Sequence, residues 1–254
     1  MSTNGWTSPP ASPWRPDDPH ILNLLTSAPV VGSRWLASGS NEVFLLELDG
    51  GAAGQGLAVY KPQRGEAPLW DFPSGSLYRR EVASFRLSRA LGWPAIPPTV
   101  AREGPHGMGA VQCYIPSVSG AHYLTFRHER VAEVQAVALF DLLTNNADRK
   151  AGHCLLGEDG RVWAIDHGLT FHVEPKLRTV IWDFVGERVP DALVEDLERL
   201  SQGLATDPSF VAELGSLLEP AEMAALARRC QALLERPVFP EPAPNRRSVP
   251  WPMV

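Results

Sequence analysis

Two acidic residues in the middle of the chain have the types and the spacing of a metal-dependent phosphoryl-transfer site. Asp148 follows an Asn-Asn-Ala segment, and Asp166 directly follows the apolar run 162–165. The charged turn 157–161 is expected to fold the apolar segments on either side of it back on each other. In such a site one aspartate orients a nucleophilic hydroxyl, and a second holds a divalent cation that bridges the outer phosphates of a nucleotide. We therefore predict that Asp148 and Asp166 act on the same ligand.

The segments around these aspartates resemble the catalytic and metal-binding loops of the type II phosphatidylinositol 4-kinases and the HipA-type kinases. The similar positions are Asp148-Arg149 with Leu155-Leu156 downstream, and the run Ala164-Ile165-Asp166-His167-Gly168-Leu169. The resemblance spans roughly residues 39–171. It implies an atypical kinase of the phosphatidylinositol 3-/4-kinase-like superfamily, with ATP and Mg²⁺ as cofactors and Mn²⁺ as the alternative ion.

Two positions that are asparagine in these kinases are histidine here, namely His153 and His167. An asparagine carbonyl is a hard ligand for magnesium, whereas a neutral imidazole is softer and suits zinc or manganese better. The resemblance assigns the metal to Asp166 and His153. His153 either completes that metal site or hydrogen-bonds Asp166, and both interpretations stay open. Arg149 or Lys150 is expected to neutralise charge on the transferred phosphoryl group.

A lysine and a glutamate upstream are predicted to hold the nucleotide. Strands are predicted over 43–48 and 57–60, and the second of them ends at Lys61. A helix is predicted over 76–91, where apolar residues recur at helical spacing, and Glu81 lies in its first turns. In kinase-like folds such a lysine pairs with the inner phosphates and with a helix glutamate. The catalytic residues are therefore predicted to be Asp148, Lys61 and Glu81.

Small residues and backbone groups are expected to complete the nucleotide site. The segment 37–42 contains small polar residues that let backbone amides approach phosphate oxygens. A third strand, predicted over 110–115, would line the adenine pocket through its backbone. The predicted nucleotide-binding residues are Ser40, Asn41, Lys61, Gln112 and Tyr114.

Composition restricts the class of protein. The chain has 254 residues, 44% of them hydrophobic, which is enough for one large domain or two modest lobes. Its 23 Lys and Arg against 29 Asp and Glu give a net charge of -6, so no nucleic-acid partner is expected. Cys113, Cys154 and Cys230 form no Cys-x-x-Cys pair, which argues against structural zinc or disulfides and favours the cytoplasm. Stable membrane insertion is not expected, because no run of about eighteen apolar residues occurs.

We predict an α+β fold with the two lobes of a protein kinase, a small β-rich N-lobe and a larger, mostly helical C-lobe. The expected units are a disordered N-terminal tail at 1–20, the N-lobe at 21–116, the C-lobe at 117–236 and a poorly ordered, Pro-rich tail at 237–254. In the first helix of the C-lobe, Val131 is expected to face inward. Helices of the C-lobe are predicted over 130–143, 191–201, 208–218 and 220–236.

These features together predict an ATP- and Mg-dependent phosphotransferase that moves the γ-phosphate to a hydroxyl of a protein, a lipid or a small molecule. Two alternatives stay open. One is a weak or inactive pseudokinase that acts as a nucleotide-binding interaction module, and it is motivated by His153 and by the Pro-rich tails. The other is transfer of AMP on the same fold, which differently labelled ATP distinguishes from transfer of phosphate.

Overall fold

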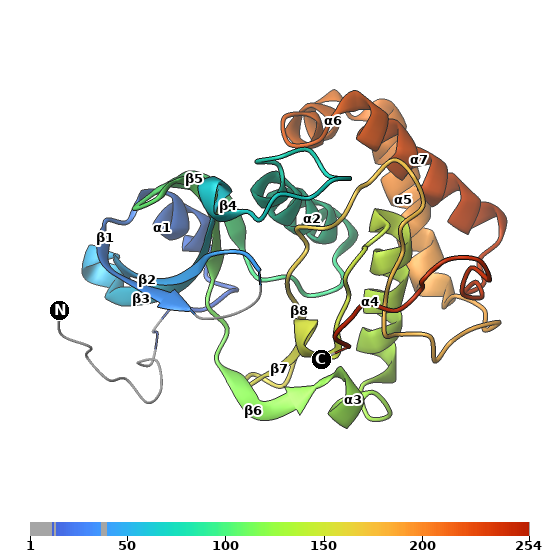
Figure 1. Cartoon of the computed structure of the whole chain (residues 1–254), viewed down its shortest axis with the longest axis horizontal. Coiled ribbons are helices and arrows are strands. Elements are labelled where there is room, and N and C mark those ends of the chain that lie inside the picture. Colours follow the sequence, from blue (N-terminus) through green and yellow to red (C-terminus); the bar gives the residue numbers. More distant parts are fainter. Residues whose placement is uncertain (1–11, 13, 37–39, 254) are drawn as a thin grey trace.

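The N-lobe is built around a five-stranded antiparallel sheet. The structure, a computed structural model, describes residues 12, 14–36 and 40–253. The strands of the N-lobe are β1 (Val30–Leu36), β2 (Val43–Asp49), β3 (Gln55–Pro62), β4 (Thr99–Gly104) and β5 (Gly107–Cys113). They lie in the order β1-β2-β3-β5-β4, and every neighbouring pair is antiparallel (Figure 1).

The two faces of this sheet contact different helices. On one face, α1 (Ile21–Ser27) packs in a cluster in which Tyr60 is fully buried. On the opposite face, Val82 of α2 (Leu77–Leu91) belongs to a small buried cluster with a residue of β5. Side chains alternate between the faces along a strand, so Lys61, which follows Tyr60, points toward α2. The register of β3 therefore decides which residue faces the second lobe.

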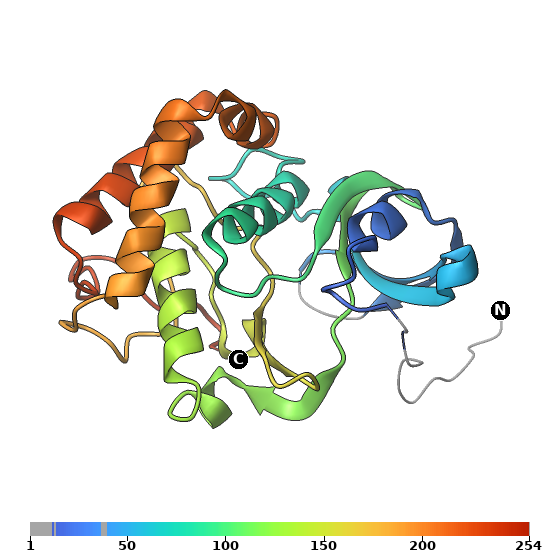
Figure 2. The ribbon, with the colours of Figure 1, turned by 180° about the vertical axis from the view of Figure 1, so that it is seen from behind.

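The C-lobe contains the longer helices and a three-stranded sheet. Its helices are α3 (Tyr123–Phe126), α4 (Val131–Thr144), α5 (Asp191–Thr206), α6 (Pro208–Gly215) and α7 (Pro220–Glu235). Its strands are β6 (Ser117–His122), β7 (Cys154–Gly157) and β8 (Val162–Ala164), in the order β6-β7-β8. The predicted turn between the last two is confirmed, because Gly157 N donates to Arg161 O at 2.9 Å. Figure 2 shows the two lobes from behind, with the five-stranded sheet at one end and the helices at the other.

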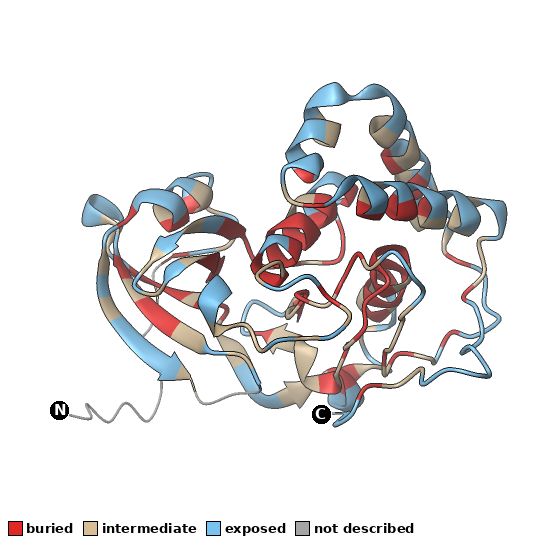
Figure 3. Ribbon diagram, turned by 45° about the horizontal axis from the view of Figure 1, so that its top comes forward, coloured by how far each residue is buried: buried red, intermediate tan, exposed pale blue. Residues whose placement is uncertain are grey.

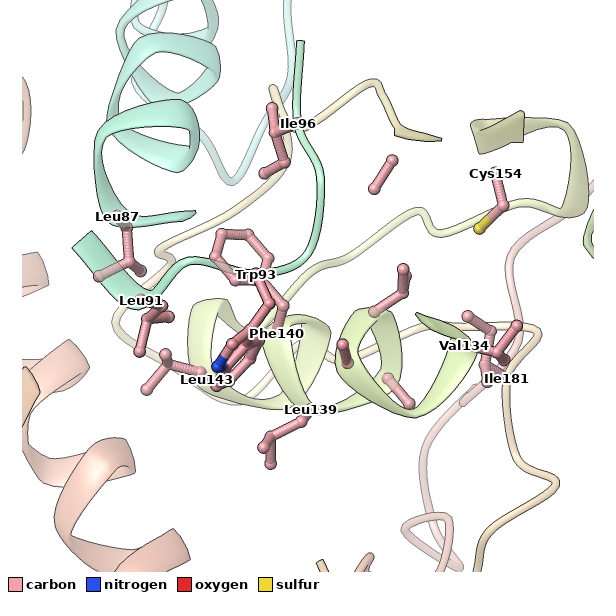
Figure 4. Close-up of a cluster of buried hydrophobic side chains, with 14 of the residues drawn as sticks. Leu87, Leu91, Trp93, Ile96, Val134, Leu139, Phe140, Leu143, Cys154 and Ile181 are labelled. Atoms are coloured by element: carbon pink, nitrogen blue, oxygen red, sulfur yellow. The ribbon is translucent and has the colours of Figure 1, made fainter. Parts of the chain in front are cut away.

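Helix α4 supplies the centre of the C-lobe core. In Figure 4, Leu139, Phe140 and Leu143 of α4 lie among side chains from α2 and from the segment after it, including Trp93. Those three α4 residues have no exposed surface, and burying each contributes about 1.5–3 kcal/mol. Val131 is 44% exposed, so its predicted inward orientation is wrong. The first turn of α4 lies at the surface, and the buried part of the helix begins at Val134.

Helix α2 is fixed by both lobes, although it follows the N-lobe strands in the sequence. It is buried over most of its length (Figure 3). Arg80 of α2 forms an ion pair with Glu222 of α7, and these residues are only 2% and 5% exposed. The Nε atom of Arg80 also donates to Thr170 O at 2.9 Å. A buried guanidinium is tolerated only with such partners, so the position of α2 depends on the C-lobe.

The segment before α1 packs on the N-lobe sheet. Trp14 is 4% exposed, and its Nε1 donates to two backbone carbonyls of the turn 51–54, at 3.2 Å each. Its ring covers Gly56, where an added Cβ would lie 2.0 Å from the indole. The prediction of a disordered tail over 1–20 is therefore wrong for the described part of that range. The physical reason is that β3 has no side chain at Gly56, so the indole packs there and donates to the turn 51–54. The rest of the range 1–20 lies outside the described residues.

The described part of the Pro-rich segment, residues 237–253, packs along the C-lobe. Phe239 is 4% exposed, and its ring lies against an aromatic ring of the C-lobe with the centroids 5.5 Å apart. Further along, Ser248 O accepts a hydrogen bond from Thr179 N at 3.0 Å. The expectation of a poorly ordered tail is wrong for 237–253, because apolar side chains and backbone groups find partners that composition does not reveal. Val254 lies outside the described residues.

Candidate active site

The two lobes enclose a cleft with a volume of ≈ 640 Å³. The cleft is lined by every residue predicted for the site, namely Ser40, Asn41, Lys61, Glu81, Gln112, Tyr114, Asp148, His153 and Asp166. The first six come from N-lobe segments and from α2, and the last three come from the loops on either side of β7 and β8. The structure therefore brings the predicted lysine strand and the two predicted loops to one place.

Lys61 lies between two carboxylates. Its Nζ forms an ion pair with Glu81 of α2 and a hydrogen bond with Asp166 Oδ1 at 3.0 Å. Burial alone would lower the pKa of Lys61, but the charges of Asp166 and Glu81 outweigh burial and raise it. The ammonium is therefore fully charged at neutral pH. Glu81 itself is 2% exposed, and burial raises its pKa despite the neighbouring lysine.

Asp166 has a strained backbone that turns its carboxylate into the cleft. Its φ is +61°, in the left-handed region that non-glycine residues rarely adopt. Such a conformation costs on the order of 1–3 kcal/mol and is typical of functional sites. The left-handed turn after β8 is made by Asp166 itself, and the nearby Gly168 is not among the described residues with positive φ.

The carboxylate of Asp166 is shared by two neighbours while its side chain stays 46% exposed. Oδ1 accepts from Lys61, and Oδ2 lies 3.2 Å from His153 Nε2. Burial would raise the pKa of Asp166, but the charge of Lys61 and the hydrogen bond from it dominate and lower it. Asp166 is therefore ionised throughout the physiological pH range.

His153 approaches Asp166 as a neutral hydrogen-bond donor. It ends a 3₁₀ turn over Ala151–His153, and its Nδ1 accepts from Lys150 N at 3.4 Å. The proton of the neutral ring then lies on Nε2, which faces Asp166. Burial lowers the pKa of His153 to about 4, although the charge of Asp166 opposes this. Of the two interpretations of His153, this geometry matches the hydrogen bond to Asp166, and its role as a metal ligand stays a prediction.

Asp148 is held by the loop that follows α4. Helix α4 ends at Thr144, and the next residue, Asn145, has a φ of +55° that reverses the chain direction. Asn146 Oδ1 then accepts from Asp148 N at 3.0 Å. Lys150 Nζ lies 3.2 Å from the Asp148 carboxylate. Burial, together with the charge of Asp166, raises the pKa of Asp148 in spite of Lys150. A carboxylate with a raised pKa is a better proton acceptor than a free one.

Arg149 does not face the cleft. It has no exposed surface, its Nη2 lies 3.0 Å from Asp141 Oδ1, and its Nη1 donates to Ile165 O at 2.7 Å. The expectation that Arg149 neutralises charge on the phosphoryl group is therefore wrong, and only Lys150 stands at the cleft. Arg149 instead connects the loop of Asp148 to the loop of Asp166 from the buried side, away from the cleft. Its partner Asp141, buried in α4, is not among the residues predicted for the site from the sequence.

At the end of the cleft predicted to bind the nucleotide, the side chains of Gln112 and Asn41 form hydrogen bonds within the N-lobe. Gln112 is 5% exposed, and its side-chain amide donates to Thr99 Oγ1 at 2.9 Å, so its side chain belongs to the sheet. Asn41 Oδ1 accepts from Ala67 N at 2.8 Å and so connects the loop before β2 to the segment after β3. Residues 37–39 of the predicted phosphate loop lie outside the described residues. Tyr114 continues from β5 and lines the cleft.

The donor set in the cleft fits a divalent cation that arrives with a nucleotide. Among the described residues, no three His, Cys, Asp or Glu side chains are grouped closely enough to hold a metal alone. Mg²⁺ is usually bound by one or two carboxylates together with phosphate oxygens and water, and Asp148 and Asp166 offer such oxygens. A buried orphan, Glu81 Oε2, has no partner among the described residues and marks further unused acceptor capacity beside Lys61.

A β-rich lobe, a helical lobe and a cleft between them define the class of this protein as one with an atypical kinase fold. The structure superposes on that described as "crystal structure of the Golgi casein kinase with Mn/ADP bound" with a TM-score of 0.53. The match covers 85% of this chain and 74% of that chain at 17% sequence identity. A likeness at this identity shows the fold, and it confirms the predicted α+β two-lobed class.

One relative places the chain in a particular family. The sequence is 35% identical over 271 aligned residues to Protein Rv2133c of Mycobacterium tuberculosis (strain ATCC 25618 / H37Rv), covering 93% of this chain and 95% of that protein. The chain belongs to the family of Protein Rv2133c. A shorter match, 30% identical over 108 residues, is to Phosphatidylinositol 4-kinase gamma 4 of Oryza sativa subsp. japonica, covering 35% of this chain and 19% of the rice protein. No protein-family model matches the sequence.

Membrane-spanning helices are not found in the described part of the chain, where no helix has both the length and the apolar character to cross a bilayer.

Proposed function

We propose that this protein is a phosphotransferase that uses ATP and a divalent cation to phosphorylate a hydroxyl group. The observation that carries the proposal is the convergence of Lys61, Asp148 and Asp166 on one cleft. These residues come from β3, from the loop after α4 and from the loop after β8. An ammonium and two carboxylates arranged between two lobes are the groups that in-line phosphoryl transfer requires.

Each residue has a role that follows from its surroundings. Lys61, kept charged and positioned by Glu81, binds the inner phosphates of ATP. Asp166, with His153 beside it, holds the divalent cation, which when bound neutralises charge on the phosphate oxygens. Asp148 accepts the proton of the attacking hydroxyl, since burial raises its pKa. The hydroxyl oxygen bonds to the γ-phosphorus, the bond from that phosphorus to the β–γ bridging oxygen breaks, and ADP leaves.

The finer assignment is to the phosphatidylinositol 3-/4-kinase-like kinases. It is supported by the motifs around Asp148 and Asp166 and by the local match to a rice protein named as a phosphatidylinositol 4-kinase. The structural neighbour described with Mn/ADP bound supports a nucleotide with Mg²⁺ or Mn²⁺ as the cofactors. The acceptor is a hydroxyl of a protein, a lipid or a small molecule, and a cytoplasmic location stays a prediction.

The test is incubation of the protein with γ-labelled ATP and either Mg²⁺ or Mn²⁺, with protein, lipid and metabolite acceptors scored in parallel. Labelled product from the wild type, and none from the Asp166→Asn variant, is the expected result. Label that transfers only from α-labelled ATP would instead identify an AMP transferase. Nucleotide-dependent thermal stabilisation without any labelled product would identify a pseudokinase.

A further inference from the structure

The last described residues of the chain lie beside the loop that carries Asp148. We call residues 248–253 the C-terminal segment. Ser248 O accepts hydrogen bonds from Thr179 N at 3.0 Å and from Trp182 Nε1 at 3.2 Å, which fixes the start of the segment on the C-lobe. Pro250 is buried, and Pro252 lines the same cleft as Asp148. In Figures 1 and 2 the end of the chain lies next to the strands of the C-lobe sheet.

One hydrogen bond connects the C-terminal segment to the catalytic loop. Met253 O accepts from Ala151 N at 2.8 Å. Ala151 begins the 3₁₀ turn Ala151–His153, and the first amides of a helical turn have no partner within it. Ala151 has no exposed surface, so water does not replace such a partner readily. The carbonyl of Met253 therefore fills a position that the turn itself leaves open.

The turn held by this bond places two groups of the candidate active site. It carries His153, whose Nε2 lies 3.2 Å from Asp166 Oδ2, and it begins three residues after Asp148. The cleft keeps a volume of ≈ 640 Å³ while Pro252 forms part of its wall. The C-terminal segment therefore borders the site and does not fill it.

We propose that the C-terminal segment is a positioning element of the active cleft, which holds the Ala151–His153 turn so that His153 meets Asp166. This inference rests on the proposed phosphotransferase function. The element that holds the turn is residues 248–253 of this chain, and it does so through the backbone carbonyl of Met253. The predicted role is in the alignment of the catalytic loop, and the grip of Lys61 and Glu81 on the nucleotide is predicted to be independent of it.

Two variants test the proposal. The first lacks residues 248–254. The second is Ala151→Pro, which removes the donor N–H and places the proline ring where Met253 O lies. Lys150 has φ -91° and ψ 163°, a conformation that suits the residue before a proline, and a proline is well tolerated at the first position of a helical turn. The matched control is Asp191→Pro, at the first residue of α5, which also follows a residue with extended backbone.

The expected result is that both variants lose about 100-fold in kcat, the loss typical of a misplaced catalytic group, while the thermal shift caused by Mg-ADP is retained. Asp191→Pro is expected to keep the wild-type rate. Hydrogen–deuterium exchange should show faster exchange in the peptide that contains Ala151–His153 in both variants and not in the control.

A higher rate after removal of the segment would overturn the proposal, because the segment would then be inhibitory. An unchanged rate in both variants would overturn it as well. If the wild type transfers no phosphate, the proposed function fails, but exchange in the Ala151–His153 peptide still decides whether the segment holds the turn. Unchanged exchange in that peptide would refute the inference on its own.

Discussion

Replacement of Glu222 by alanine is expected to be among the most destabilising single changes in this protein, although the residue is far from the cleft in sequence. Its Oε1 pairs with the guanidinium of Arg80, which is 2% exposed, and its Oε2 accepts from Glu219 N at 2.9 Å. An uncompensated buried charge costs about 3–5 kcal/mol. Loss of the second hydrogen bond adds about 1 kcal/mol. The free energy of unfolding should therefore fall by about 4–6 kcal/mol, and the Tm by about 8–24 °C for a chain of this size.

The measurement is urea and thermal unfolding of Glu222→Ala beside two comparison variants. Asp191→Ala removes an ion pair with Arg188 whose side chains are 79% and 74% exposed, and it should cost at most about 1 kcal/mol. The double variant Arg80→Met with Glu222→Met leaves no unpaired charge and should recover most of the lost stability. A loss from Glu222→Ala no larger than that from Asp191→Ala would refute the reasoning about burial. So would a double variant as unstable as the single one.

The remaining predictions concern the cleft and the N-terminal packing. Asp166→Asn should abolish phosphoryl transfer with an unchanged circular dichroism spectrum, and detectable turnover would contradict its role at the metal. Lys61→Met should weaken binding of Mg-ADP by tenfold or more, about 1.4 kcal/mol or more, in isothermal titration calorimetry. Because the pKa of Asp148 is raised and its base form is the active one, kcat should fall as the pH falls through that pKa; Asp148→Asn should lose this acidic limb along with most of the rate. Gly56→Ala should cost about 1–3 kcal/mol in chemical unfolding, because the new methyl group displaces Trp14, and an unchanged midpoint would argue against this packing.

Elements with a repeating apolar pattern inside one segment are predictable from the sequence. Helix α2 and helix α4 show helical spacing, and strand β3 shows a short apolar run, so all three are found close to their observed bounds. Strand β1 escapes this reasoning because Gly32, Ser33 and Arg34 interrupt its alternation. What makes it a strand is its pairing with β2, which is an interaction with a distant part of the chain.

The members of the candidate site are more predictable than their orientations. Asp148, Asp166 and Lys61 follow from local motifs, and all three line the cleft. The direction of Arg149 does not follow, because it depends on Asp141, which lies in α4 and has no exposed surface. One signal was available in the sequence, since an acidic residue within the apolar, buried part of a helix is rarely left without a cation.

The left-handed backbone of Asp166 and the packing of both chain ends are likewise non-local. No residue type at position 166 requires a positive φ, so only the surrounding contacts produce it. Composition alone marks the Pro-rich ends as mobile, yet Trp14 and Phe239 are buried because each meets a complementary surface. Such matches between distant surfaces leave no periodic trace in the sequence.

Two neighbouring residues of α2 form ion pairs with different lobes. Glu81 pairs with Lys61 of the N-lobe, and Arg80 pairs with Glu222 of α7 in the C-lobe. A movement of α2 away from the cleft, of the kind that could switch a kinase off, would separate the buried guanidinium of Arg80 from Glu222. The carboxylate of Glu222 would then be left buried without its partner. Because that movement would leave a buried charge unpaired, its free-energy cost is high, and α2 is poorly suited to a regulatory movement.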